Sequence, residues 1–133
     1  MRFAILLAAA GLSACAVAAD RPAEVGAAED SVLSEALAGR VAGAPVSCVR
    51  RQDVRNTRGA GPDTILFDGP GNVLYVNRTR SACPRILAWH AIRNRSIGTS
   101  LCSGELIRIF DPQNGIEFGG CTLGAFTPWR RAG

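Results

Sequence analysis

The stretch Thr64–Asn77, TILFDGPGNVLYVN, decides the fold of this chain. It holds two apolar segments, residues 64–67 and 73–77, separated by the five residues DGPGN. β-Branched and aromatic residues favour strands, whereas Gly, Pro, Asn and Asp favour a tight change of direction. The stretch therefore predicts an antiparallel β-hairpin.

A second hairpin is predicted nearer the C-terminus. Residues 105–110 (ELIRIF) are followed by a turn at 111–115 (DPQNG) and by a strand over 116–126 that passes through Gly119-Gly120, where we expect a bulge or sharp bend. Residues 46–50 add a shorter strand, and residues 86–92 fit either a helix or a strand. Short strands at this spacing predict an all-β domain over residues 41–133, a small antiparallel barrel or sandwich.

The length and composition agree with one small folded domain. The chain has 133 residues, of which 47% are hydrophobic and 20% are charged. This balance can bury a core and excludes a wholly disordered chain, and the length leaves no room for a multidomain enzyme.

The N-terminal residues predict export. Residues 3–12 (FAILLAAAGL) follow Arg2 and are shorter than the ~20 residues that span a bilayer. Residues 1–19 are therefore expected to be a signal peptide. The sequence LSAC ending at Cys15 resembles a bacterial lipobox, which would be cleaved before the cysteine and would carry lipid on Cys15. The alternative is an ordinary cleavage site at Ala16-Val17-Ala18, which would discard Cys15. We favour the lipobox because its whole pattern directly follows the apolar run.

An Ala-rich spacer is predicted over residues 20–40. Residues 15–45 have a net charge of −3, whereas residues 46–133 have a net charge of +6. Within the spacer, residues 30–39 (DSVLSEALAG) combine an acidic start, apolar positions at helical spacing and a final glycine, which predicts a short helix. Such a spacer would hold a lipid-anchored domain clear of a membrane surface.

Four cysteines remain in the domain once Cys15 is set aside. An even number in a small exported chain is typical of two disulfides formed in an oxidising compartment, and three pairings are possible. A zinc site is the alternative, but the sequence has no Cys-x-x-Cys pair and only one histidine, so we expect no metal and no cofactor. The four cysteines are Cys48, Cys83, Cys102 and Cys121.

Five short segments follow one another along the domain: GRVAGAPVSC at 39–48, DTILF at 63–67, YVN at 75–77, LC at 101–102 and LGAFTPW at 123–129. In their order and spacing they resemble a family of small exported bacterial proteins known only as a domain of unknown function, many of which carry lipoprotein signals. The resemblance implies that Cys48 pairs with Cys102 and Cys83 with Cys121. It implies no catalytic residue and no ligand.

His90 is the only candidate general base in the sequence. It lies among apolar neighbours in LAWHAI at 87–92, and the sequence places no nucleophile or orienting acid beside it. We therefore expect no catalytic residue. The alternative hypothesis is a small periplasmic hydrolase that uses His90 with Asp63, Asp68 or Glu105.

A run of arginines supplies the other functional signal. Residues 78–95 contain no acid, and guanidinium groups bind phosphate and carboxylate bidentately. We expect a candidate anion-binding patch here, formed by Arg78, Arg80, Arg85, Arg93 and Arg95.

The expected function is that of a non-enzymatic cell-envelope module that binds an anionic envelope component or a protein partner. A lipid on Cys15 would hold it at the outer membrane facing the periplasm, and cleavage after Ala18 would leave it soluble in the periplasm. Nucleic acid is not expected as a partner, because export removes the protein from it and because the aromatic residues are isolated from one another.

Overall fold

The computed structural model of the chain describes residues 31–87 and 89–133. The predicted signal peptide, Cys15 and residues 20–30 of the predicted spacer lie outside these ranges. The described part contains a helix over residues 31–37, two single-turn 3-10 helices and ten strands. The elements are β1 (Arg40–Ala42), β2 (Cys48–Arg50), η1 (Arg51–Asp53), β3 (Asn56–Gly59), β4 (Thr64–Asp68), η2 (Pro70–Asn72), β5 (Leu74–Arg78), β6 (Ala91–Asn94), β7 (Ser100–Cys102), β8 (Leu106–Phe110), β9 (Glu117–Thr122) and β10 (Phe126–Arg131).

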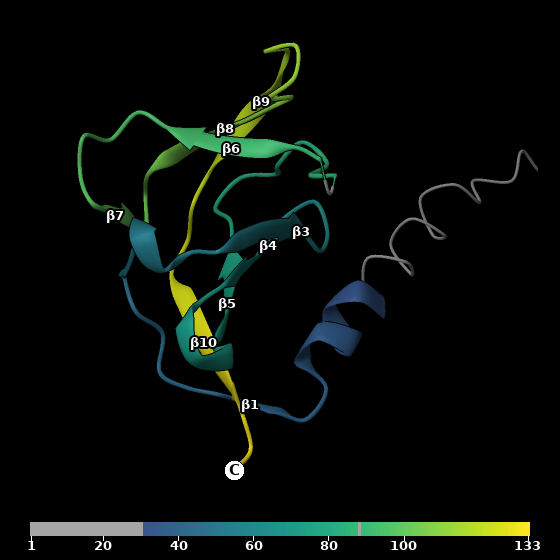
Figure 1. Cartoon of the computed structure of the whole chain (residues 1–133), viewed down its shortest axis with the longest axis vertical. Helices are drawn as coiled ribbons and strands as arrows, with labels where there is room; N and C mark the ends of the chain where they lie inside the picture. The colour runs from purple at the N-terminus through teal and green to yellow at the C-terminus, as the bar shows by residue number, and fades with distance from the viewer. Residues whose placement is uncertain (1–30, 88) are drawn as a thin grey trace, which may run out of the picture.

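Five antiparallel strands form the largest sheet, in the order β1-β10-β5-β4-β3 (Figure 1). Its centre is the predicted hairpin, which is confirmed: β4 pairs with β5, and Phe67 lies opposite Tyr75. The turn between them contains η2, where Gly71 and Asn72 both adopt a φ of +60°. The last strand, β10, pairs with β5 on one side and with β1 on the other, so the two ends of the domain lie side by side.

Two smaller sheets complete the fold, one of β2 and β7 and one of β6, β8 and β9. The predicted bulge is confirmed, because the β8–β9 register shifts between Ile109 and Phe110, opposite Gly119 with its φ of +115°. The ambiguous segment 86–92 is a strand only at its end, where β6 begins at Ala91.

The prediction of one strand over residues 116–126 is wrong. β9 ends at Thr122 in the three-stranded sheet, and β10 begins at Phe126 in the five-stranded sheet. Gly124 lies between these two strands, and the buried side chain of Asn77 binds its backbone. Asn77 Nδ2 donates to the Gly124 carbonyl (2.8 Å), and Asn77 Oδ1 accepts from the Gly124 N–H (2.9 Å). The Asn77 amide thus forms the two backbone hydrogen bonds that a neighbouring strand would otherwise form with Gly124, and it holds the segment between β9 and β10 against β5.

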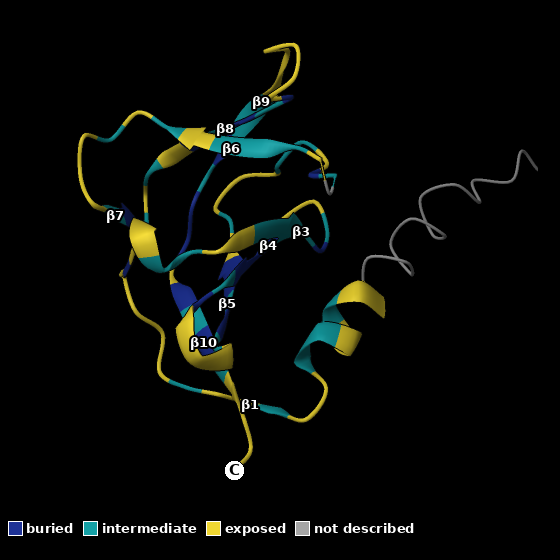
Figure 2. Ribbon diagram, in the orientation of Figure 1, coloured by how far each residue is buried: buried dark blue, intermediate teal, exposed yellow. Residues whose placement is uncertain are grey.

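The five-stranded sheet is buried on both of its faces (Figure 2). On one face, Ile65 and Phe67 pack in the main core with residues of β2, β7, β8 and β9. On the other face, Leu66, Leu74 and Val76 form a second core. The helix over residues 31–37 covers this second core with Leu33, Ala36 and Leu37, and Trp129 packs beside them. The predicted all-β fold of packed antiparallel sheets, preceded by a short helix, is confirmed, and that helix packs on the domain.

Both disulfides have the pairing that the family resemblance implied. Cys48–Cys102 joins opposite positions of β2 and β7, and Cys83–Cys121 joins the segment before β6 to β9. The zinc alternative is wrong, because all four sulfurs are used in these bridges. Two structural disulfides indicate an oxidising, exported environment. In residues 31–87 and 89–133 we find no helix with the length and apolar character needed to cross a bilayer.

Candidate functional site

The two arginines of the predicted patch at and just after the end of β5 have local partners. Arg78 Nη1 donates to the Thr64 hydroxyl (2.8 Å) and lies 3.6 Å from a carboxylate oxygen of Asp63. Arg80 Nη2 donates to the hydroxyl of Ser103 (3.1 Å). The first contact joins the end of β5 to the start of β4, and the second joins the segment after β5 to the segment after β7.

The other arginines of the patch lie around β6. The guanidinium carbon of Arg93 lies 4.5 Å from the centre of the Phe110 ring, a cation–π contact on the surface of the three-stranded sheet. Arg85 and Arg95 are exposed. Although the five arginines are close in sequence, Arg93 is the only one that lines a cavity described below.

His90 is surrounded by aromatic rings. Its imidazole stacks on Phe118 at 4.4 Å between ring centres and meets the edge of Trp89 at 4.1 Å. The N–H of Leu87 donates to its Nδ1 (3.1 Å), and its Nε2 is enclosed without a hydrogen-bond partner among the described residues. A general base needs an oriented ring and a nitrogen that the substrate can reach.

The three carboxylates proposed as partners of His90 bind elsewhere in the described residues. Asp63 contacts Arg78, as above, and Asp68 accepts from Arg58 Nη1 at 2.8 and 3.0 Å. Glu105 belongs to a separate polar network. The structure therefore does not bring His90 together with any of these acids by a hydrogen bond or an ion pair.

Glu105 is the centre of a network at the start of β8. Its two oxygens accept from Ser96 Oγ (2.7 Å) and Asn94 Nδ2 (3.0 Å). Burial acts to raise the pKa of Glu105, but the bond from Ser96, a hydrogen bond with the Cys102 backbone, the bond from Asn94 and the charge of Arg51 together lower it below its ordinary value. The carboxylate is thus held ionised as a structural hydrogen-bond acceptor.

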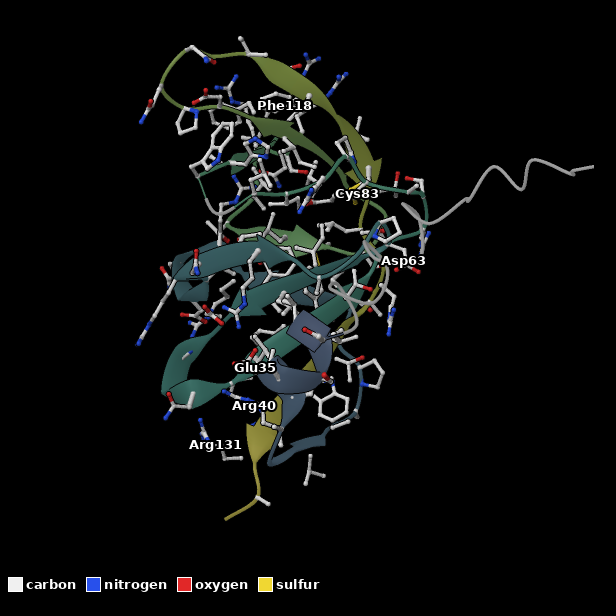
Figure 3. The ribbon with its side chains drawn as sticks, turned by 90° about the vertical axis from the view of Figure 1, so that its right-hand side faces the viewer. Glu35, Arg40, Asp63, Cys83, Phe118 and Arg131 are labelled. Carbon is white, nitrogen blue, oxygen red and sulfur yellow. A yellow bond between two sulfur atoms is a disulfide. The ribbon has the colours of Figure 1, made fainter. Side chains whose placement is uncertain are left out.

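A second group of cations lines a pocket of about 400 Å³ between the helix and the sheet end where β1 meets β10. Of the residues that the structure describes, three arginines and a single acid, Glu35, line it. Glu35, Arg40 and Arg131 lie at the same end of the molecule, and Phe118 lies at the opposite end (Figure 3). The lining residues are Val32, Glu35, Ala36, Ala38, Arg40, Arg58 and Arg131.

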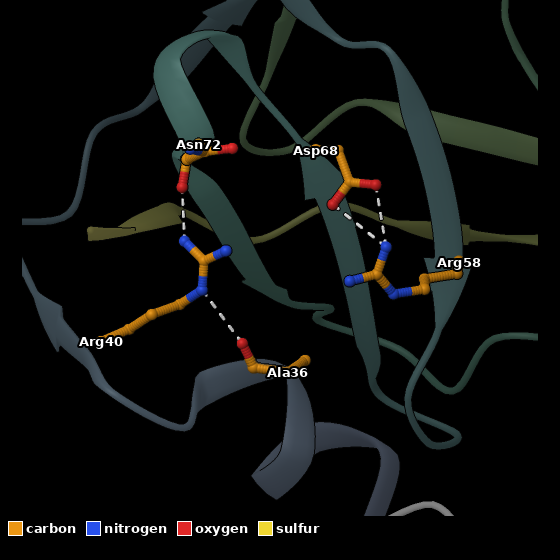
Figure 4. A network of polar contacts seen from close by, with 5 residues as sticks. All are labelled: Ala36, Arg40, Arg58, Asp68 and Asn72. Carbon is orange, nitrogen blue, oxygen red and sulfur yellow. Dashed lines mark hydrogen bonds and ion pairs between the residues drawn. The ribbon is translucent and has the colours of Figure 1, made fainter. Parts of the chain in front are cut away.

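Arg40 is held rigidly at this pocket by backbone carbonyls (Figure 4). Its Nε donates to the carbonyl of Ala36 (3.1 Å) in the last turn of the helix, and its Nη1 donates to the carbonyls of Asn72 and Trp129. A cation is favourable at the C-terminal end of a helix, where the macrodipole is negative. Since Nη2 is not used in these bonds, Arg40 both fastens the helix to the sheet and presents free donors.

Arg58 and Arg131 complete the pocket. Arg58 uses Nη1 for both oxygens of Asp68, which leaves its other guanidinium donors outside that pair. Arg131 is exposed and lies directly opposite Arg40 in the β1–β10 register. In the part of the chain that the structure describes, neither Arg40 nor Arg131 forms an ion pair with a carboxylate. Like charges directly opposite each other destabilise a sheet, so a bound anion would relieve this pair.

Sequence analysis missed this pocket, because its arginines stand at positions 40, 58 and 131. No local pattern joins them. The signal that would have found them is the pairing of the first strand with the last, which is a property of the tertiary fold.

Comparison of the chain with models of protein families, with curated proteins and with solved structures finds no match. The family resemblance in the sequence thus stays a prediction.

Proposed function

We propose that this chain is an exported, non-enzymatic module of the cell envelope that binds an anionic envelope component in the pocket of Arg40, Arg58 and Arg131. The observation that carries the proposal is the β1–β10 register, which sets Arg40 opposite Arg131 on the wall of the pocket, where neither arginine forms an ion pair with a carboxylate of the described residues. Keeping two guanidinium groups opposite each other is costly unless an anion binds to both.

The chemistry favours a phosphate or carboxylate group as the ligand. A guanidinium group offers planar pairs of N–H donors that match two oxygens of such a group. The three backbone carbonyls that fix Arg40 occupy its Nε and Nη1 donors, so its Nη2 can donate to an anion without reorganisation of the side chain. The exposed Arg131 can supply a planar pair of donors. The pocket is open to solvent, so binding should weaken as salt concentration rises.

The predicted anchor agrees with an envelope ligand. Lipid on Cys15 would place the domain at the outer membrane facing the periplasm, within reach of anionic headgroups and of other envelope polymers. The intact mass of the protein purified from membranes tests this part: an acylated Cys15 at the mature N-terminus supports it, and a mature start at Ala19 contradicts it.

Vesicle binding tests the pocket. The full chain is prepared with Cys15→Ser, so that lipid on the protein cannot itself hold it on vesicles. Cosedimentation with phosphatidylglycerol–phosphatidylcholine vesicles is then compared for Arg131→Glu and Arg130→Glu. These adjacent positions of β10 point to opposite faces of the strand, and the two changes alter net charge equally.

We expect Arg131→Glu to weaken vesicle binding about tenfold or more, the loss of one charge-assisted contact, and Arg130→Glu to change it by less than about twofold. Inorganic phosphate should compete if the phosphate group itself is recognised. Equal losses in the two variants would mean that only net charge matters, and would overturn the proposal. A loss confined to Arg78→Glu/Arg80→Glu/Arg85→Glu would transfer the function to the patch predicted from sequence and would also overturn it.

A further inference from the structure

A second, independent surface lies between the edges of two sheets. β3 is the edge strand of the five-stranded sheet, and β6 is the edge strand of the three-stranded sheet (Figure 1). Two cavities of about 260 and 230 Å³ lie between them, and both are lined by Val54, Thr57 and Ile92. Because they share these three residues, the two cavities form one groove along the two edges.

The free backbone groups of β3 can be assigned from its register. The Ala60 N–H donates to the Thr64 carbonyl, so Ala60 and Thr64 form a hydrogen-bonded pair. In an antiparallel pair of strands, such pairs occur at every second residue. Arg58 and Asn56 are therefore the residues of β3 whose backbone groups bond to β4. The N–H and C=O of Thr57 must then point away from β4. Thr57 lines both cavities, so this unpaired backbone lies at the groove.

The free backbone groups of β6 follow from its register in the same way. The Leu123 N–H donates to the Glu105 carbonyl, so every second residue of β8 from Glu105 onward, Ile107 and Ile109, bonds to β9. The backbone groups of Arg108 and Phe110 point to the other side and bond to β6. Their partners on β6 are Arg93 and Ala91, which leaves the N–H and C=O of Ile92 pointing away from β8. Both sheets therefore present unpaired backbone groups from residues that line the same groove.

The side chains of the groove define what would fit it. Val54, Ile92 and Leu101 give it an apolar floor, and Arg51, Arg55 and Arg93 stand around it. Within residues 31–87 and 89–133, no acid lines either cavity. An extended chain added to a sheet edge gains backbone hydrogen bonds and inserts alternate side chains into pockets, and the charge around the groove selects between chains.

We propose that this groove binds an extended, acidic segment of a partner protein by strand addition. Charge complementarity favours such a segment over a second copy of this chain, because two copies joined at these edges would bring their arginines together. The proposal does not depend on anion binding at Arg40, Arg58 and Arg131, which line a different cavity.

A peptide of alternating valine and glutamate, labelled with a fluorophore, is a direct probe, and the matched peptide of valine and lysine is its control. Thr57→Pro removes the unpaired N–H without breaking a bond to β4, since proline is tolerated where a strand N–H faces outward. Thr57→Val retains that N–H. We expect fluorescence anisotropy to show about a tenfold weaker affinity for the glutamate peptide with Thr57→Pro, and a change of less than about twofold with Thr57→Val.

A second variant keeps the proposal testable if Thr57→Pro does not fold. Arg55→Glu/Arg93→Glu changes only exposed side chains and should reverse the preference, so that the lysine peptide binds better than the glutamate peptide. An unchanged preference would overturn the proposal. Equal binding of the glutamate peptide by Thr57→Pro and Thr57→Val would also overturn it. The same holds for loss of peptide binding in Arg131→Glu, and for a dimer of the chain that the peptide does not disrupt.

Discussion

The two ends of the molecule are stabilised in different ways. The five-stranded sheet is buried on both faces, and every residue of β4 from Thr64 to Phe67 is buried. The β6-β8-β9 sheet buries Ile107 and Ile109 on one side only, and its β9 end exposes Ile116 and Phe118 (Figure 2). In the three-stranded sheet, the Cys83–Cys121 disulfide and the Glu105 hydrogen bonds add to the stability, whereas the five-stranded sheet is stabilised mainly by burial of both of its faces.

This difference matches the two surfaces that we propose. The arginine pocket lies on the rigid end, where Arg40 is held by the helix, the turn and β10. The groove lies where the large sheet faces the smaller one and where both edges are open. A fixed anion site needs rigid donors, whereas strand addition needs an unpaired edge.

The largest expected effect is at the junction that joins the two ends. A Cβ at Gly124 would lie 1.9 Å from the Arg78 carbonyl oxygen, which no rotation of a side chain relieves. Gly124→Ala should therefore lower the free energy of unfolding by about 3 kcal/mol, measured by denaturant unfolding. Gly98→Ala is the control, because its Cβ would meet only the Ser100 nitrogen at 3.8 Å. Equal stability of the two variants would contradict the close packing of Gly124 against the Arg78 carbonyl at the end of β5.

The disulfides come next. Cys83→Ala/Cys121→Ala and Cys48→Ala/Cys102→Ala each remove one bridge, at a cost of about 2–4 kcal/mol. The first pair should cost more, because Cys121 is 1% exposed in the main core whereas Cys48 is exposed. Denaturant unfolding of the two double variants measures the difference. A greater loss of unfolding free energy in Cys48→Ala/Cys102→Ala would contradict this, because the sheet of β2 and β7 would then depend more on its disulfide than the three-stranded sheet does.

The smallest effect is the pH dependence of the Glu105 network. Since folding lowers the pKa of Glu105, the carboxylate contributes stability above its unfolded pKa, and this contribution is lost as pH falls through the lowered folded value. Glu105→Gln should remove this part of the acid sensitivity, at a cost of about 1 kcal/mol at neutral pH. Unfolding at pH 7 and at successively lower pH values below 4.5, the ordinary value, provides the comparison. Parallel curves for the variant and the parent would contradict it.

The parts of the fold that sequence analysis predicted are those encoded locally. The hairpin at residues 64–77, the glycine bulge and the helix before Gly39, whose φ is +68°, each depend on neighbouring residues. The break between β9 and β10 was missed, because it depends on Asn77, a side chain 47 residues away from Gly124. The pairing of cysteines came from the family resemblance, since their spacing alone left three choices.

The candidate site was the least predictable part. An arginine run such as residues 78–95 is visible in the sequence, but strand directions carry Arg78 and Arg93 to different sheets. Arg40 and Arg131 meet only because β1 pairs with β10. Closeness in sequence therefore indicated a patch whose arginines at 78 and 93 lie in two different sheets, and it gave no indication of the pocket of Arg40, Arg58 and Arg131.

A phosphate titration followed by NMR of the arginine Nε–Hε groups tests the central claim most directly. The account predicts that inorganic phosphate shifts the signals of Arg40, Arg58 and Arg131 together, with one affinity that falls as salt is added. Shifts confined to Arg78, Arg80, Arg85, Arg93 and Arg95, or no saturable shift at the three pocket arginines, would contradict it.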